Sequence, residues 1–260
     1  MMNLSSTMNA YGCRYCVSPL KQLLHTTNHH LRFRPCSPSL FSSSFNNLKL
    51  PNFNLLLTSN SFFFTMEHLW DRSGMNTNKK MVEHLQQYGV ISSEKVARVM
   101  ETIDRALFVP DKTPAYADCP QEIGTGYLTA CFAMMVGPQG RAIGVEHIPE
   151  LVASSVNNIE KSAAAPLLKK GSLSMHVGDG REGWPECAPY DAIHVGAAAP
   201  EMPQALLDQL KPGGRMVIPV GNIFQDLKVV DKNPDGSISI RSESSVRYVP
   251  LTSRDAQLQS

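Results

Sequence analysis

The sequence predicts an α/β fold in which a mostly parallel sheet carries helices on both faces. Two observations support this prediction. From residue 125 onwards short apolar strand patterns alternate with helical patterns, and the last strand patterns pair around a turn signal. Strands that alternate with helices form parallel sheets, because each connecting helix packs back on the sheet. With 260 residues, the chain is long enough for one sizeable core and an appendage.

A small helical subdomain is predicted ahead of the sheet. Residues 79–88 form one predicted helix, which Gly89 ends. A second helix, capped by Ser92 or Ser93, is predicted from four apolar residues that share one face: Val96, Val99, Met100 and Ile103. Prolines then mark a loop, so residues 66–124 are predicted as a helical N-terminal subdomain with a loop.

Residues 125–260 hold the predicted sheet domain. Helices are expected at residues 128–135, 149–161 and 202–210. Strands are expected at residues 141–145, 173–177, 190–195, 215–220 and 246–251. Between the last two, residues 227–231 and 237–240 alternate around Asn233-Pro234-Asp235-Gly236, which predicts a hairpin, and residues 211–214 are expected to stop the helix before them.

The first 65 residues differ in composition from the rest. They contain five basic residues and no Asp or Glu, and they are rich in Ser, Asn, Leu and Phe. This composition is typical of an organelle transit peptide, and the abundance of Ser favours the chloroplast. A disordered leader is the alternative, and Met66 is a possible second start, which would leave the protein in the cytoplasm or nucleus.

Composition also argues against several partners. Residues 66–260 hold 19 Lys or Arg against 23 Asp or Glu, so they carry no basic patch suited to nucleic acid. The apolar runs of the leader are too short to span a membrane. Cys13 and Cys16 have no second pair at zinc spacing, so no metal site is expected. A monomer is the default expectation.

Acidic residues and glycines follow the predicted strands where ligands of such sheets bind, just beyond the carboxyl ends. Glu146 ends one strand and is placed to accept hydrogen bonds from ribose hydroxyls. Asp179 follows the next strand and could meet an adenine amino group, while Gly180 lets the backbone come close. A solvated acid at Glu146 and a plain turn at Asp179-Gly180 are the alternatives.

Two histidines are ambiguous. His147, beside Glu146, is either a wall of a cofactor pocket or a surface histidine. His194 lies inside an apolar strand pattern and is expected to be a core or pocket-floor histidine rather than a catalytic one.

The turn Gly124-Thr125-Gly126 is typical of the start of a nucleotide-binding helix, yet no strand leads into it. The residues before it, 118–123, are polar and include a proline. A Gly-rich turn holds a cofactor only when a buried strand fixes it against the following helix.

Several ordered blocks resemble protein-L-isoaspartate O-methyltransferases of the plant type. They include Val82-Glu83-His84-Leu85, Ile103-Asp104-Arg105-Ala106, Gly126-Tyr127-Leu128-Thr129-Ala130, Gly144-Val145-Glu146-His147, Gly178-Asp179-Gly180-Arg181, Tyr190-Asp191-Ala192-Ile193-His194 and Leu210-Lys211-Pro212-Gly213-Gly214. The resemblance covers about residues 79–258.

The resemblance implies a Rossmann-like, S-adenosylmethionine-dependent methyltransferase fold. The implied reaction moves a methyl group to the free carboxylate of an L-isoaspartyl or D-aspartyl residue in a damaged protein, which starts its repair. It assigns cofactor binding to seven residues: Gly124, Gly126, Glu146, His147, Asp179, Gly180 and Thr252.

The chain departs from this family pattern at the Gly124–Thr125 junction. Members carry roughly 40 further residues there, about the size of a loop, a helix and a strand. The loop that would hold the substrate carboxylate is absent, so the resemblance assigns no catalytic residue, and the first central strand of the sheet is missing. A skipped exon (alternative splicing) or an error in the gene model would produce such a junction.

Three functions therefore stay open from the sequence. The first is a plastid repair methyltransferase, and the second is a truncated, inactive isoform that binds substrate protein or cofactor weakly. The third is a nicotinamide-dependent enzyme, which the terminal hairpin and the lack of a G-x-G-x-x-G run disfavour.

Overall fold

A computed structural model describes residues 76–111, 113–117 and 125–259 of the chain. The predicted leader, Cys13, Cys16, Met66 and Gly124 lie outside these residues. The elements before the first strand are α3 (Asn78–Gln87), α4 (Glu94–Thr102), η2 (Arg105–Phe108) and α5 (Tyr127–Val136). Then follow β1 (Ala142–Glu146), α6 (Pro149–Glu160), α7 (Ala165–Lys170), β2 (Leu173–Val177), η3 (Pro185–Cys187), β3 (Tyr190–His194), α8 (Gln204–Gln209), β4 (Leu210–Val220), β5 (Gln225–Lys232), β6 (Ile238–Val246) and α9 (Arg254–Gln259).

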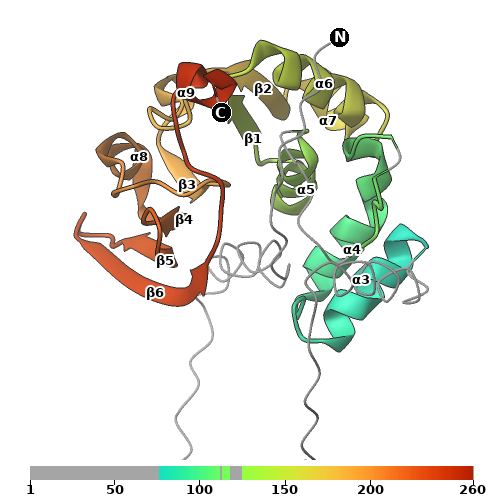
Figure 1. Ribbon diagram of the computed structural model, residues 1–260, viewed down its shortest axis with the longest axis horizontal. Coiled ribbons are helices and arrows are strands. Elements are labelled where there is room, and N and C mark those ends of the chain that lie inside the picture. Colours follow the sequence, from blue (N-terminus) through green and yellow to red (C-terminus); the bar gives the residue numbers. More distant parts are fainter. Residues whose placement is uncertain (1–75, 112, 118–124, 260) are drawn as a thin grey trace, which may run out of the picture. The chain divides into compact units, whose positions relative to one another are not determined.

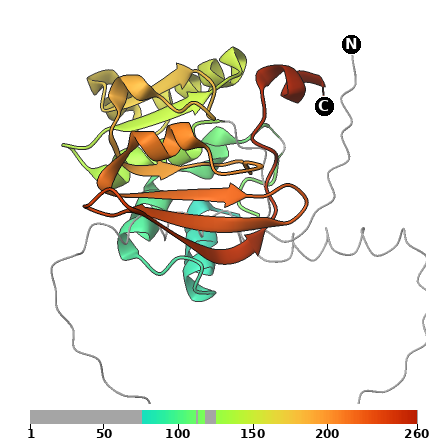
Figure 2. The same ribbon diagram turned by 90° about the vertical axis from the view of Figure 1, so that its left-hand side faces the viewer.

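The strands form two separate sheets (Figure 1). One has two parallel strands, β1 and β2, with Glu146 opposite Val177 at its carboxyl edge. The other has the order β3-β4-β5-β6, in which β3 and β4 are parallel and β4 to β6 are antiparallel. Figure 2 shows the long hairpin of β5 and β6 that the sequence predicts. The α/β prediction is therefore confirmed, while the missing central strand stays a prediction: among the described residues β1 pairs only with β2, and β3 only with β4.

Helices α3 and α4 form where the apolar spacing places them. Met81, Val82 and Leu85 of α3 are buried, and Thr77 caps its start by accepting a hydrogen bond from the backbone N–H of Lys80. Ser93 precedes α4, but its side chain makes no capping hydrogen bond. The buried amide of Asn78 donates to the carbonyl of Met100 at 2.6 Å, so the start of α3 is fixed to the end of α4.

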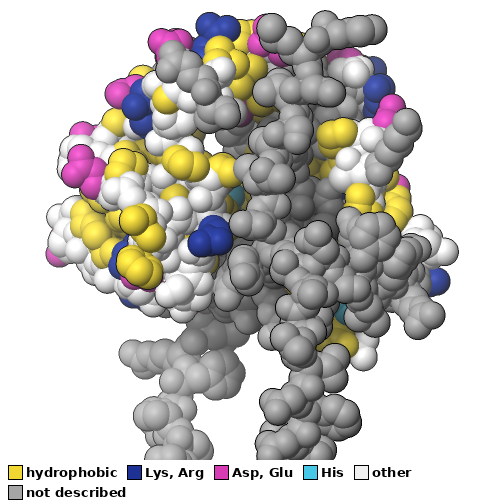
Figure 3. Space-filling view, viewed as in Figure 1, with side chains coloured by type: hydrophobic (Ala, Val, Ile, Leu, Met, Phe, Trp, Pro, Cys, Tyr) yellow, Lys and Arg dark blue, Asp and Glu magenta, His cyan; other side chains and the backbone are white. Residues whose placement is uncertain are grey.

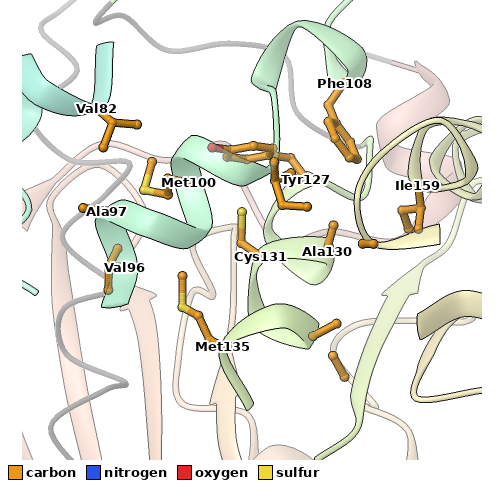
Figure 4. Packing of buried hydrophobic residues seen from close by; sticks show 14 of the residues in the cluster. Val82, Val96, Ala97, Met100, Phe108, Tyr127, Ala130, Cys131, Met135 and Ile159 are labelled. Carbon is orange, nitrogen blue, oxygen red and sulfur yellow. The ribbon is translucent and has the colours of Figure 1, made fainter. Parts of the chain in front are cut away.

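Three apolar clusters stand behind the two sheets. The N-terminal core joins α3, α4, η2 and α5 with β1 and β2, and Figure 4 shows residues of α4 facing residues of α5 within it. In the C-terminal half, one cluster packs α8 against β4 and β5, and a separate cluster consists of Val217, Leu227 and Val229. Among the described residues, Phe132 of α5 packs on the N-terminal core and on this last cluster. Residues 76–111 and α5 thus share one core, and the domain boundary at residue 125 stays a prediction.

Several predicted elements differ from the structure. The strand expected at 215–220 begins at Leu210, because residues 211–214 continue it with a register shift against β3. No strand spans 246–251; β6 ends at Val246, and only Pro250 makes an isolated bridge, to Ala198. Helices α7 and α9 were not expected. Helix α7 has a proline near its start and α9 has no apolar stripe, so the periodicity of apolar residues does not predict either helix.

The outer surface of the second sheet is open to solvent. Ile238 and Ile240 of β6 are exposed, and apolar side chains gather over this sheet on the face that Figure 3 presents. Among the described helices none is long and apolar enough to cross a membrane. The described residues hold no group of three or more His, Cys, Asp or Glu side chains that could bind a metal ion.

Candidate functional site

The carboxyl ends of β1 and β2 bring the predicted acidic residues to one edge. The backbone N–H of Gly178 donates to the carbonyl of Glu146 at 3.1 Å, which continues the pairing one residue beyond β2. Asp179 and Gly180 come next in the chain. Glu146 and Asp179-Gly180 are therefore neighbours, as the strand order required.

Glu146 is half-buried and held by its own chain. Its Oε1 accepts a hydrogen bond from the backbone N–H of Ile148 at 3.0 Å. This bond holds the carboxylate at the start of α6 without using its second oxygen. Glu146 is therefore oriented, which a freely solvated acid would not be.

His147 is a half-buried side chain with two partners. Its Nε2 lies 3.8 Å from Oε1 of Glu146 and 2.5 Å from Oε1 of Gln257 in α9. The ring therefore belongs to a wall made with the C-terminal helix. Gln257 could not be found from the sequence, because α9 shows no periodic pattern.

Asp179 is paired with Arg181. Arg181 donates to both carboxylate oxygens, at 2.6 Å from its terminal nitrogen to Oδ2, and its backbone N–H donates to Oδ1 at 2.9 Å. The side-chain hydrogen bonds of Arg181 lower the pKa of Asp179 below its usual range. An adenine amino group would have to share these oxygens with Arg181.

The two glycines of the site differ in what surrounds them. A methyl group added to Gly180 would meet only Leu251, at 3.8 Å, so space beside its backbone is open, and Thr252 follows Leu251 in the chain. Gly126 has a φ of 83° and precedes α5, and a methyl group there would lie 3.0 Å from Cβ of Ser155 in α6. Gly126 is thus required by the turn and by helix packing.

Two aromatic contacts involve histidine rings, one at the end of β3 and one in β2. The His194 ring, at the end of β3, is 5.7 Å from the Phe132 ring of α5, and burial lowers the pKa of His194 to about 4. Trp184 stacks on His176 of β2 with ring centroids 4.3 Å apart, and a methyl group added to Gly178 would lie 3.2 Å from the Trp184 ring. The indole Nε1 of Trp184 is buried with no hydrogen-bond partner among the described residues. Trp184 was not found from the sequence, since a lone tryptophan in a loop carries no pattern.

Comparison with known proteins identifies the family. The sequence model of protein-L-isoaspartate(D-aspartate) O-methyltransferase (PCMT) matches residues 76–125 and 122–256. The chain belongs to this family. It is therefore an enzyme by descent, and the nicotinamide-dependent alternative is excluded.

Relatives in plants are similar over most of the chain. Protein-L-isoaspartate O-methyltransferase 1 of Arabidopsis thaliana is 61% identical over 227 residues, which cover 74% of this chain and 99% of the relative. Methyltransferase 2 of the same plant is 52% identical over 289 residues, which cover 98% of this chain and 88% of that relative. The second alignment must include most of the acid-free leader, so that leader is shared with a relative.

A solved structure is similar in fold. The Plasmodium falciparum protein-L-isoaspartate O-methyltransferase, crystallised in complex with S-adenosyl-L-homocysteine, superposes with a TM-score of 0.61 and 26% identity. The match covers 68% of this chain and 99% of that protein.

Proposed function

We propose that this chain descends from a repair enzyme that methylates the free carboxylate of L-isoaspartyl or D-aspartyl residues, and that as it stands it is an inactive, truncated form. One observation carries the proposal: among the described residues, β1 and β3 each have a single strand partner, on one side only. Within the part of the chain that the structure describes, no strand leads into the turn at Gly126.

A count of aligned positions supports a missing segment. The alignment with Arabidopsis methyltransferase 1 runs over 227 residues, whereas 74% of the 260 residues here is about 192, so about 35 aligned positions have no counterpart in this chain. The family model also matches in two pieces that meet at residues 122–125. The break in the family match supports a gap at the Gly124–Thr125 junction, and the count supports its size.

The methyl donor of this reaction is S-adenosyl-L-methionine, and the residues present suit one half of it. Glu146 keeps one carboxylate oxygen free for ribose hydroxyls, and the backbone at Gly180 is open. At the other half, Gly126 is turned towards α6, where Ser155 and Ile159 fill the space. We therefore assign the adenosine end to Glu146, His147, Asp179, Gly180 and Thr252, and the other end to residues that this chain lacks.

Such a reaction depends on positioning. A carboxylate is already a nucleophile and a sulfonium methyl group is already activated, so the protein must mainly hold the two in line. Correct orientation of two reactants contributes about 7–11 kcal/mol to a reaction of this kind. A chain that binds only one end of the methyl donor loses most of that contribution.

The decisive experiment measures transfer of a labelled methyl group from S-adenosylmethionine to an isoaspartyl peptide by the purified full chain. The matched peptide with a normal aspartyl link is the substrate control. A chain with the Arabidopsis segment inserted between Gly124 and Thr125 is the enzyme control. We expect transfer only with the restored chain. Transfer at a similar rate by both would show that this chain is a competent repair methyltransferase.

Cell location and assembly are further proposals. The acid-free leader supports import into the chloroplast, with a cytoplasmic or nuclear form if translation starts at Met66. A fluorescent fusion of residues 1–65 should enter chloroplasts, and uniform cytoplasmic fluorescence would contradict this.

We propose a monomer that binds isoaspartyl proteins and neither nucleic acid nor membranes. Light scattering tests the monomer, and binding assays test the partners.

A further inference from the structure

The chain contains two Asp-Gly dipeptides, Asp179-Gly180 and Asp235-Gly236, and no Asn-Gly. An aspartate before glycine is chemically fragile, because glycine has no side chain to keep its backbone nitrogen away from the neighbouring carboxyl group. The nitrogen forms a bond to Cγ, and the amide proton leaves as water together with the carboxyl hydroxyl. Water then cleaves the resulting succinimide between its nitrogen and the former main-chain carbonyl. The product is an isoaspartyl link, and the net change is an isomerisation that needs no co-reactant.

Asp235-Gly236 lies in the tight turn between β5 and β6. The backbone N–H of Gly236 donates to the carbonyl of Asn233 at 2.8 Å, and the N–H of Asn233 donates to the carbonyl of Ser237 at 2.8 Å. Gly236 has a φ of 86°, which is typical of the left-handed glycine that closes such a hairpin turn. The amide that would attack Asp235 is therefore already engaged in a hydrogen bond.

The carboxylate of Asp235 is held by Ser237. Its Oδ1 accepts a hydrogen bond from the backbone N–H of Ser237 at 2.9 Å and another from the hydroxyl of Ser237 at 2.7 Å. The hydroxyl, followed by the backbone N–H, lowers the pKa of Asp235 below its usual range. A carboxyl group must be protonated before it can lose its hydroxyl as water. Hydrogen bonds that favour the ionised form therefore oppose ring closure.

The same arrangement occurs at Asp179-Gly180. The backbone N–H of Arg181 donates to Oδ1 of Asp179 at 2.9 Å, and the guanidinium group of Arg181 donates to both carboxylate oxygens. As in the hairpin turn, the residue two positions after the aspartate supplies both a backbone donor and a side-chain donor. Two turns in different sheets thus hold their aspartates in the same way, although the side chains that do so differ.

We propose that the two Asp-Gly dipeptides are latent sites of isoaspartyl formation in this chain. Ser237 and Arg181 restrain the reaction in the folded state by holding the carboxylates of Asp235 and Asp179. Conversion inserts a methylene group into the main chain and shortens the side chain, so at Asp179 it displaces the carboxylate that follows β2. The inference goes beyond the proposed function, because it requires neither methyl transfer nor cofactor binding.

A variant pair at Ser237 tests the restraint. The full chain, Ser237→Ala and Ser237→Thr are each kept folded at neutral pH for several weeks and then digested with trypsin, which releases residues 233–241. Chromatography separates the isoaspartyl form of this peptide, and electron-transfer fragmentation identifies it. We expect conversion at Asp235 to be about threefold to tenfold faster in Ser237→Ala, because one hydrogen bond to the carboxylate is lost. Ser237→Thr keeps the hydroxyl and should convert as slowly as the unchanged chain.

Asp179 provides an internal control in the same samples. Its conversion should be the same in both Ser237 variants, whereas Arg181→Gln should accelerate conversion at Asp179 and leave Asp235 unchanged. In concentrated urea the hydrogen bonds are absent, so the Ser237 variants should convert at the rate of the unchanged chain.

Three results would overturn the proposal. The first is equal conversion at Asp235 in folded Ser237→Ala and the folded unchanged chain. The second is conversion of Ser237→Thr at the rate of Ser237→Ala. The third is faster hydrogen exchange at the amides of Asn233 and Gly236 in Ser237→Ala, which would assign its faster conversion to an opened turn. Methyl transfer is not measured, so these outcomes are independent of the activity assay.

Discussion

At the scale of single residues, a glycine or histidine pattern predicts that a position is special but not why. Gly126 fits a cofactor turn in the sequence, and in the structure its left-handed φ and its closeness to α6 also call for glycine. His194 was expected to be a core or pocket-floor histidine, and its ring lies 5.7 Å from the ring of Phe132. His147 could be assigned only when α9 was located, because its partner Gln257 is 110 residues away.

Replacing Gly126 by alanine should destabilise the chain through two effects. The left-handed φ of 83° costs about 1–2 kcal/mol for a residue with a Cβ, and the contact with Ser155 adds about 1–3 kcal/mol. Gly171→Ala is the matched control, because Gly171 has the same left-handed backbone (φ 76°, ψ 12°) but a methyl group there meets nothing within 4 Å. The two free energies of unfolding are measured in urea. If both variants lose the same amount, packing against α6 does not explain Gly126.

His194 should make stability depend on pH. Its folded pKa is about 4, below the value of about 6.5 for an unfolded chain, so between these values the unfolded state binds more protons. The contribution is complete above pH 6.5 and is lost as pH falls towards 4, by on the order of 3 kcal/mol. His194→Gln should remove this part of the slope in unfolding curves measured from pH 7.5 to pH 4. An unchanged slope in the variant would assign the pH dependence to other groups.

At the scale of elements, apolar periodicity predicted most helices and strands. It failed where backbone contacts determine where an element begins or ends. The bounds expected for β2 match the structure to the residue. Residues 211–214 read as a helix stop, yet Gly214 lies so close to the backbone of Tyr190 and Asp191 that a methyl group would clash, and the strand continues past it. Helix α9 has no buried side chain among its described residues and therefore no signal in the sequence. The strand-end site followed from strand order, which explains why Glu146 and Asp179 could be placed together.

The second sheet is held by an ion cluster across three strands. Asp231 of β5 accepts hydrogen bonds from Arg215 of β4 at 2.6 Å and from Arg241 of β6 at 2.9 Å. Burial would raise the pKa of Asp231, but the hydrogen bonds and charge of Arg215, with the charge of Arg241, lower it overall. The contribution of Asp231 to stability should therefore be lost as pH falls through its folded pKa.

Asp231→Asn should cost about 1–2 kcal/mol at pH 7. Because the folded pKa lies below the unfolded value of about 3.9, the difference from the unchanged chain should persist above pH 4 and shrink as pH falls through the folded pKa. Urea unfolding at pH 7 and below pH 3 measures it. The control is Asp191→Asn, whose carboxylate pairs with Lys211 but is 84% exposed and should change little. A loss that is the same at both pH values would mean that charge is not involved.

At the scale of the whole molecule, the described residues form two cores that share few contacts. The N-terminal core ends with β2 and the C-terminal clusters begin with β3, and among the described residues Phe132 packs on the N-terminal core and on the C-terminal cluster of Val217, Leu227 and Val229. A parallel sheet normally couples such halves through the backbone of its central strand. Here the described contacts that join the halves include Phe132, the stacking of Trp184 on His176, the hydrogen bonds of Gln209 in α8 to Glu182 and Trp184, and the contact of His147 with Gln257.

The two cores should therefore unfold separately. Small single domains unfold in one cooperative step because their parts stabilise one another, and few side chains carry that coupling here. Hydrogen exchange followed at rising urea concentration should show residues 142–177 and residues 215–231 losing protection at different concentrations. In a chain with the Arabidopsis segment restored, both regions should lose protection together, because a central strand would pair with β1 and β3 at once. Phe132→Ala should widen the separation in the present chain. Coincident loss in the unchanged chain would mean that the side-chain contacts between the cores are strong enough to replace a strand.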